Sequence, residues 1–309
     1  MKITQGLVEQ HIHGAFGIDF MDCSIEDIHQ AAILLAQNGV TAFFPTIMTA
    51  DLKLIKERIS VIKEAKMTQN RKMAQIIGVH LEGPFINPKK AGIHDAKYIL
   101  PLEISLYKEI EDEIIKIVTL APEFDYSGSF REYLNYKGIK VSLGHSESVD
   151  FGKIHQVTHL YNAMGAFHHR NKSSVVEALC SDDIFIEIIA DSKHVNDNVL
   201  KITFKQKALD KILLISDALP LAHSDKDSMI FAGKEIYNKE GNLVSKDGTL
   251  AGSSMLLCDI VKNLVDKKLM TFENAIKCTT SNQYSYHNIL NILNVYWNEY
   301  NEIIKVDFI

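Results

Sequence analysis

Short apolar runs recur along this chain, and most of them end at an ionisable side chain, which limits the folds that the chain can adopt. Eight runs of strand length alternate with longer amphipathic segments: Gly6–His13, Val40–Met48, Ala74–Leu81, Ile115–Leu120, Ile139–Leu143, Gln156–Tyr161, Phe185–Ala190 and Ile212–Ser216. Near-continuously apolar strands are typical of parallel sheets that are covered on both faces. The alternation therefore predicts an α/β fold, a (β/α)8 TIM-type barrel.

Helix-like patterns fill most of the gaps between these runs. They cover Ser24–Gln37, Asp51–Lys66, Leu102–Glu113, Ser127–Tyr136 and Asn196–Lys207. Ser24 followed by Asp27 resembles a capping box, so we expect the first helix to begin there. One connection is short, because thirteen residues separate His145 from His159. This connection has room for about two helical turns, near Val149–His155.

The pattern changes after the eighth run. The predicted elements are a hairpin of Met229–Ile236 and Asn242–Val244, helices at Met255–Lys267 and Thr271–Thr280, and a terminal hairpin of Ile292–Tyr296 and Ile303–Phe308. We therefore expect a barrel over residues 1–280, with a hairpin insertion near 229–250, and a β-rich accessory region over 281–309.

Composition argues against several classes of function. The 309 residues carry a net charge of −6, which does not favour binding to nucleic acid or to an anionic membrane surface. No apolar run approaches the ~20 residues that span a bilayer, and the first residues lack the pattern of a signal peptide. The four cysteines form no CxxC pair, which is typical of reduced thiols. We expect a cytoplasmic protein without a nucleic-acid or membrane partner.

Seven ionisable residues lie at the C-terminal ends of predicted strands, where the active sites of barrel enzymes form. They are His11, His13, Glu82, His145, His159, His194 and Asp217. His11 and His13 are two residues apart, so both can project from one face of a strand. Imidazole nitrogens and carboxylate oxygens are ligands of Zn²⁺ and related ions. Each residue taken alone is more often structural, but together they predict a metal site at the barrel mouth.

Asp217 directly follows the apolar run that ends at Ser216. An Asp in this position often caps the next segment. Beside a metal-bound water, the same carboxylate can accept a proton and pass it to a leaving group. From the residues alone, both roles of Asp217 stay open.

Seven motifs occur in one order between about Gly6 and Lys277. They are His11-Ile12-His13-Gly14, His80-Leu81-Glu82-Gly83-Pro84-Phe85, Ser142-Leu143-Gly144-His145-Ser146, Thr158-His159-Leu160-Tyr161-Asn162-Ala163-Met164, Ala190-Asp191-Ser192-Lys193-His194-Val195, Ser216-Asp217-Ala218 and Leu250-Ala251-Gly252-Ser253. In this order they resemble the N-acetylglucosamine-6-phosphate deacetylases, a family of the amidohydrolase superfamily of metal-dependent barrels.

The resemblance implies metal-dependent hydrolysis of the acetyl amide of N-acetylglucosamine 6-phosphate, which gives glucosamine 6-phosphate and acetate. It implies one metal site at Glu82, His145 and His159. A second ion at His11 and His13, with Glu82 as the bridge, is favoured, and single occupancy stays open. Zn²⁺ is the expected ion, and Fe²⁺ or another divalent ion is the alternative.

The same resemblance assigns the substrate contacts. Asp217 matches the general base and acid, and His94 matches a histidine that polarises the acetyl carbonyl. Asn162 and Ala163 match residues that touch the substrate, whereas Arg170 and His194 match residues that contact its phosphate. In this family part of the pocket comes from a neighbouring subunit, so a homodimer is implied.

The chain also departs from the family pattern. Family members usually begin with some tens of residues of a small β-sandwich, whereas the first barrel strand here starts almost at Met1, so we expect a reduced accessory region. The family's Arg-Glu-Pro-Gly is Arg170-Asn171-Lys172-Ser173, and its Asp-Gly is Asp191-Ser192. Two alternatives stay open: an amidohydrolase for another amide or N-acetyl amino sugar, and a non-catalytic binding relative. The choice between a gluco- and a galacto-configured sugar is also open.

Overall fold

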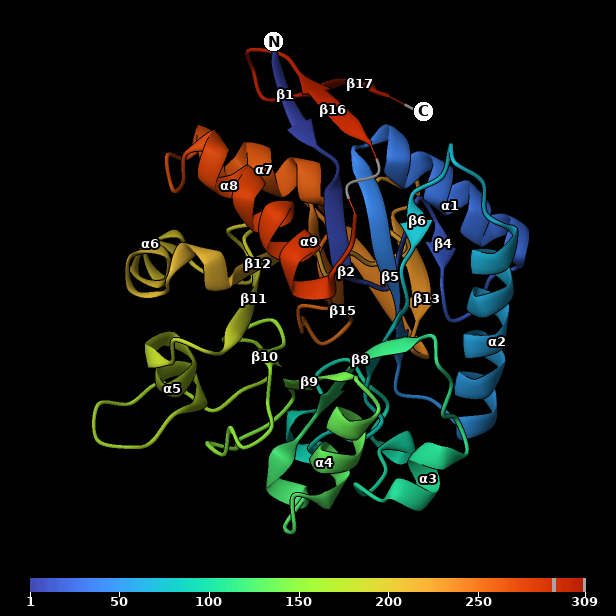
Figure 1. Cartoon of the computed structure of the whole chain (residues 1–309), viewed down its shortest axis with the longest axis vertical. Coiled ribbons are helices and arrows are strands. Elements are labelled where there is room, and N and C mark those ends of the chain that lie inside the picture. The colour runs from blue at the N-terminus through green and yellow to red at the C-terminus, as the bar shows by residue number, and fades with distance from the viewer. Residues whose placement is uncertain (291–292, 308–309) are drawn as a thin grey trace.

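Eight parallel strands form the barrel in this computed structural model, which describes residues 1–290 and 293–307. Their order around the sheet is β12-β11-β10-β9-β8-β7-β5-β2 (Figure 1). The strands are β2 (Leu7–Ile12), β5 (Val40–Met48), β7 (Val79–Glu82), β8 (Ile115–Leu120), β9 (Lys140–Leu143), β10 (Gln156–Val157), β11 (Phe185–Ile189) and β12 (Ile212–Ile215). The two ends of this sheet meet at the C-terminal mouth, where Asp217 N donates to His11 O over 3.0 Å and His13 N donates to Ala218 O over 2.9 Å. The predicted barrel is confirmed.

Helices cover the outside of the barrel in most of the predicted places. They are α1 (Ile25–Gln37), α2 (Leu52–Thr68), α3 (Ile104–Lys108), α4 (Ser129–Tyr136), α5 (Ser174–Cys180) and α6 (Asp197–Gln206). Ser24 and Asp27 form the expected capping box at the start of α1, and Asp51 caps α2. The apolar face of α1 is fully buried, with Ile28 and Leu35 in the main core. Local capping signals therefore place these helices correctly.

Two predicted strands differ from the observed ones. The run Ala74–Leu81 is divided into β6 (Gln75–Ile76), which pairs with β5, and β7, which pairs with β5 and β8. The division falls at Gly78, where a Cβ atom would lie 2.8 Å from Ile114 O. The run Gln156–Tyr161 is a strand only over Gln156–Val157, because the chain turns away to bring the next residues into the barrel mouth.

Two predicted helices differ from the structure. One is shorter than predicted, and the other is not formed. Leu102–Glu113 is helical only over Ile104–Lys108, and the acidic residues that follow would be unfavourable at the negative end of a longer helix. Val149–His155 contains no helix. Instead, Arg131 on α4 holds this loop by donating to Asp150 Oδ2 over 2.9 Å and to Gly152 O over 2.8 Å.

The insertion after β12 is a three-stranded antiparallel sheet of β13 (Ser228–Phe231), β14 (Lys234–Lys239) and β15 (Asn242–Ser245). The predicted hairpin is present as β14 and β15. The predicted run Met229–Ile236 is broken, because Ala232 and Gly233 take positive φ angles of 50° and 74° and form a further turn. Helices α7 (Leu257–Asp266) and α8 (Phe272–Thr279) follow as expected.

The last part of the chain contributes both to the barrel and to a separate small sheet. Helix α9 (Ser281–His287), which has no clear apolar periodicity, was not predicted; Asn282 Nδ2 donates to Ile212 O at the start of β12 over 2.8 Å. Strands β16 (Asn294–Trp297) and β17 (Ile303–Val306) form the predicted terminal hairpin, while Ile292 and Phe308 lie outside the described residues. Strand β1 (Lys2–Gln5) adds to this sheet beside β16, close to both termini (Figure 1). The domain limits themselves stay a prediction.

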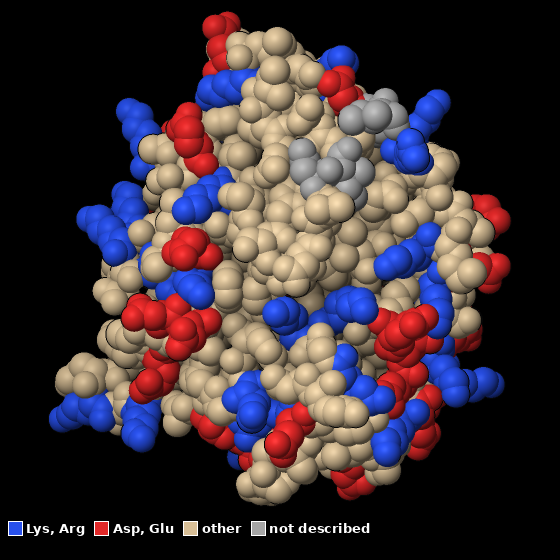
Figure 2. Space-filling model, in the orientation of Figure 1, with Lys and Arg blue, Asp and Glu red and all other residues tan. Residues whose placement is uncertain are grey.

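Several short elements lie between the longer strands and helices. The remaining elements are β3 (Gly14–Ala15), β4 (Ile18–Asp19) and the 3₁₀ turns Pro88–Lys90, Ala96–Tyr98, Pro122–Phe124 and Leu209–Lys211. None of the described helices is long and apolar enough to cross a membrane. Figure 2 shows acidic and basic side chains interspersed on one face around a largely uncharged central area. Charge of one sign does not gather on that face.

Candidate active site

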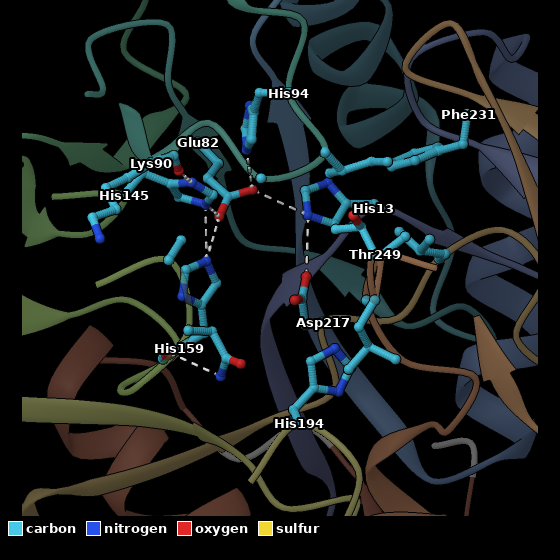
Figure 3. A pocket seen from close by; sticks show the side chains of 18 of the residues that line it. His13, Glu82, Lys90, His94, His145, His159, His194, Asp217, Phe231 and Thr249 are labelled. Atoms are coloured by element: carbon cyan, nitrogen blue, oxygen red, sulfur yellow. Dashed lines mark hydrogen bonds and ion pairs between the residues drawn. The ribbon is translucent and has the colours of Figure 1, made fainter. Parts of the chain in front are cut away.

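A cavity of about 400 Å³ opens at the C-terminal mouth of the barrel, and most of the predicted site residues line it (Figure 3). Those that line it are His13, Glu82, His94, His145, His159, Asn162, Ala163, His194 and Asp217. His11 lies fully buried next to this group. Arg170 is exposed on the loop between β10 and α5 and is not among the lining residues. The fold therefore brings together all the predicted site residues except Arg170.

Glu82, the last residue of β7, lies at the centre of the site. Its Oε1 atom is 3.0 Å from His159 Nε2 and 3.2 Å from His145 Nε2. Its Oε2 atom is 3.2 Å from His13 Nε2. Two groups of possible ligands result, one of Glu82, His145 and His159 and one of His11, His13 and Asp217. The Glu82 carboxylate contacts both groups.

Two histidines of the site each have a ring nitrogen whose lone pair faces another hydrogen-bond acceptor. His145 Nδ1 is 2.7 Å from the carbonyl of Lys90, and His11 Nδ1 is 3.0 Å from the Glu187 carboxylate. Both partners can only accept, so in the neutral rings Nδ1 carries the hydrogen and Nε2 carries a lone pair. These Nε2 atoms face the Glu82 carboxylate, and His145 Nε2 lies 3.1 Å from His159 Nε2. Acceptors that face one another fit a divalent cation between them.

The electrostatics of the site agree with this fit. Burial alone would raise the pKa of the carboxyl groups of Glu82 and Asp217, but the positive charge of the His11 ring in its protonated form, and hydrogen bonds from protonated histidines, outweigh it. A divalent cation would take the place of these protons, because it binds the histidines in their neutral form. The pKa of Glu82 therefore lies well below its usual range, and that of Asp217 falls to about 2. Both carboxylates are ionised at neutral pH, so their negative charge favours a bound cation.

A third group of potential ligands, His11, His80 and Glu187, has a different role. Both ring nitrogens of His80 already have partners, since Nδ1 lies 3.1 Å from Gln10 O and Nε2 lies 2.8 Å from Thr119 Oγ1. Burial, and then the charge of His11, lowers the pKa of His80 to about 3, so this ring is neutral. This group supports the ligand groups next to it. It offers no further site for an ion, because both nitrogens of His80 already have partners.

Several site residues have positive φ angles, which are costly for side chains other than glycine. The angles are 47° at His145, 30° at His159 and 51° at Asp217. Each of these residues follows the end of a strand, and such conformations cost about 1–3 kcal/mol each. Asp217 is held by bonds from its N to His11 O and from Ser253 N to its O, over 3.0 and 2.9 Å. The surrounding backbone therefore fixes the direction of these side chains.

His94 reaches the site from the loop after β7. Its Nδ1 lies 2.8 Å from Thr49 Oγ1, and its Nε2 lies 3.4 Å from Glu82 Oε2. Burial, followed by the charge of His145, lowers the pKa of His94 to about 4. His94 is therefore a neutral ring on the cavity wall at physiological pH.

On the opposite side of the cavity, His194 is fixed by a carboxylate. Its Nδ1 lies 2.7 Å from Asp191 Oδ2, and its backbone N donates to Asp191 Oδ1 over 2.9 Å. Ser192, where the family pattern has glycine, takes a φ angle of 64°, and its hydroxyl accepts a bond from Asn263 Nδ2 over 2.9 Å. This bond compensates for part of the conformational cost of replacing glycine.

Some residues of the site were not found from the sequence. Lys89, Lys90 and Thr249 line the cavity, and their only sequence signal is nearness to a motif. Residues 250–252 also line it and belong to a motif that had been identified but given no role. Glu187 interrupts the apolar run of β11 with a charge, which was a usable signal for a buried polar contact. Thr49 and Asp191 act only through the histidines that they hold, so their roles depended on the fold.

Comparisons with known proteins agree with the geometry. No protein-family model matches the chain. The chain is 33% identical over 297 residues to the N-acetylglucosamine-6-phosphate deacetylase of Bacillus subtilis (strain 168), with 89% of this chain and 74% of the relative covered. Crystal structures of N-acetylglucosamine-6-phosphate deacetylases from Pasteurella multocida and Thermotoga maritima each superpose with a TM-score of 0.90 over 99% of this chain. They are 25% and 27% identical to it, and 85% and 87% of their chains are covered.

Proposed function

This chain belongs to the N-acetylglucosamine-6-phosphate deacetylase family, and we propose that it hydrolyses the acetyl amide of N-acetylglucosamine 6-phosphate to glucosamine 6-phosphate and acetate. One feature of the site supports this chemistry. At the mouth of the barrel, lone pairs of His11 and His145 face the Glu82 carboxylate, and the ionised Asp217 lies beside them. This arrangement suits metal-assisted attack of water on an amide.

The metal ligands follow from the two groups of facing atoms. Glu82, His145 and His159 would hold one divalent ion, for which Zn²⁺ is the proposed identity. His11 and His13 would hold a second ion, and the Glu82 carboxylate contacts both groups of ligands. When bound there, a divalent ion would lower the pKa of a bound water towards about 7 and polarise the acetyl carbonyl.

Asp217 transfers the proton, and His94 binds the acetyl oxygen. Asp217 is ionised at neutral pH, so it accepts the proton of the attacking water and returns it to the amine as the amide bond breaks. In the tautomer in which His94 Nδ1 accepts from Thr49, the hydrogen of this neutral ring is on Nε2, where it can bind the acetyl oxygen. Both groups are held in place before the substrate binds.

The sugar phosphate is held on the side of the cavity that carries His194. Asn162 and Ala163 border the same cavity and contact the sugar. Arg170 is exposed and outside this cavity, so we assign it to the phosphate bound in a neighbouring subunit of a homodimer. Sedimentation analysis checks the assembly, and a monomer with full activity would refute the role of Arg170 across subunits.

Acetate release tests the catalytic assignment. The Asp217→Asn protein should lose about 10²- to 10⁴-fold in kcat, because removal of a general base has effects of this size. Exposed Asp225 on the loop that follows provides the matched control, and Asp225→Asn should keep the wild-type rate. Wild-type kcat in Asp217→Asn would overturn the mechanism.

Substrate analogues test specificity. N-acetylglucosamine 6-phosphate, its galacto epimer and unphosphorylated N-acetylglucosamine are compared in the wild-type and Arg170→Met proteins. Arg170→Met should raise KM for the phosphorylated sugars only, because Arg binds phosphate oxygens with a planar fork of donors. Indifference of the wild type to the 6-phosphate would instead favour another amide substrate. A purified chain that takes up no metal and releases no acetate would favour a non-catalytic relative.

A further inference from the structure

Glu187 is a fully buried carboxylate at the middle of β11, inside the barrel and next to His11. Four donors surround it. Gln10 Nε2 and Gln156 Nε2 lie 2.5 and 2.9 Å from its Oε1 atom. His11 Nδ1 and the backbone N of His159 lie 3.0 and 3.2 Å from its Oε2 atom. The carboxylate thus contacts one residue from each group of metal ligands.

Only an ionised carboxylate satisfies this set of donors. Asp and Glu accept about four hydrogen bonds and donate none when ionised, whereas an amide offers one acceptor atom and adds two donor hydrogens. The orientation of Gln10 is itself fixed, because the His287 ring lies 2.6 Å from its Oε1 atom and turns its amino group towards Glu187. The network therefore requires negative charge at position 187.

Among the four histidines of the two ligand groups, His11 has a special partner. His145 Nδ1 binds the neutral carbonyl of Lys90. The Nδ1 atoms of His13 and His159 are buried without a hydrogen-bond partner in the described part of the chain. His11 alone binds a carboxylate through Nδ1, and a carboxylate in this position increases the basicity of the opposite nitrogen and fixes the ring.

We propose that Glu187 is a positioning residue that sets the affinity of the group His11, His13 and Asp217 for its divalent ion. The inference rests on the metal site of the proposed function. Glu187 acts by holding the His11 ring so that its Nε2 atom faces the other two carboxylates. This atom lies 3.5 Å from Glu82 Oε1 and 3.4 Å from Asp217 Oδ1. Loss of such a partner typically weakens metal binding by about 10- to 100-fold.

This role is tested by titrating the metal-free protein with Zn²⁺ in a calorimeter. Metal analysis after gel filtration counts the bound ions. The wild type should bind two ions. Glu187→Gln should bind the ion at Glu82, His145 and His159 as before and the other about 10- to 100-fold more weakly. Acetate release by the wild type is measured separately, so a failure of the proposed function is not confused with a failure of the metal assignment.

Two further variants separate positioning from a general loss of structure. Gln156→Met removes another buried donor to Glu187 but leaves the His11 contact, and it should keep both affinities. In a His11→Ala background, Glu187→Gln should have no further effect on Zn²⁺ affinity, because coupled residues are not additive. Uptake of one ion by the wild type, wild-type affinities in Glu187→Gln, or an equal loss in the His11→Ala background would each overturn the proposal.

Discussion

Replacement of Arg131 by Met should destabilise the fold beneath the site, because it leaves a buried carboxylate without its charged partner. Arg131 Nε lies 3.0 Å from Asp125 Oδ2, and both side chains are at most 6% exposed. The same guanidinium holds the loop after His145 through Asp150 and Gly152. The change therefore acts both on the start of α4 and on the segment that replaces a helix between β9 and β10.

The size of the effect follows from these contacts. At 3.0 Å and an effective dielectric constant of about 20, the charges attract by about 5.5 kcal/mol. After the substitution, Asp125 still accepts bonds from the backbone N atoms of Phe130 and Arg131 over 3.2 and 3.0 Å. Breaking a buried pair typically costs about 3–5 kcal/mol, and the retained bonds place this pair near the lower limit. The exposed contact with Asp150 adds little.

Urea unfolding, monitored by circular dichroism, measures this loss as a shift of the unfolding midpoint at a constant denaturant slope. Arg131→Met should lose about 3 kcal/mol in the free energy of unfolding. Exposed Arg71→Met is the control and should change it by less than about 0.5 kcal/mol. Adding Asp125→Asn to Arg131→Met should restore part of the loss. A loss below about 1 kcal/mol, or no recovery in the double variant, would refute the reasoning.

Two further predictions concern the loops after β12. Gly252 has a φ angle of 99°, and a Cβ atom there would lie 2.9 Å from the carbonyl oxygen of Asp217. Gly252→Ala should therefore move Asp217 and lower kcat by roughly tenfold to hundredfold in the acetate assay, and an unchanged kcat would contradict it. A hydrogen bond to Asp259 raises the pKa of His223 in the folded state. This contact stabilises the fold below the unfolded pKa of ~6.5, and its contribution is lost as the pH rises through the raised value. The urea midpoint should fall over this range in the wild type and not in His223→Gln.

Local patterns in the sequence predicted most of the barrel and most of the site. The apolar runs correspond closely to strands such as β5 and β8 because buried parallel strands need nearly continuous apolar residues. Ionisable residues such as Glu82 and Asp217 could be identified because a charge at the end of an apolar run is visible in the sequence alone. Cap residues such as Ser24 are equally local signals.

The tertiary structure decided what depends on contacts between distant residues. The segment Val149–His155 has no helix because Arg131, on another element, holds it as a loop. Glu187 lies 176 positions from His11 in the chain, so only the closed barrel shows that it holds that ring. The sequence by itself determined the strands and the chemical types of the ligands, since these follow from local periodicity. Only the fold decided which lone pairs face one another, because hydrogen bonds across the barrel set the orientation of each ring.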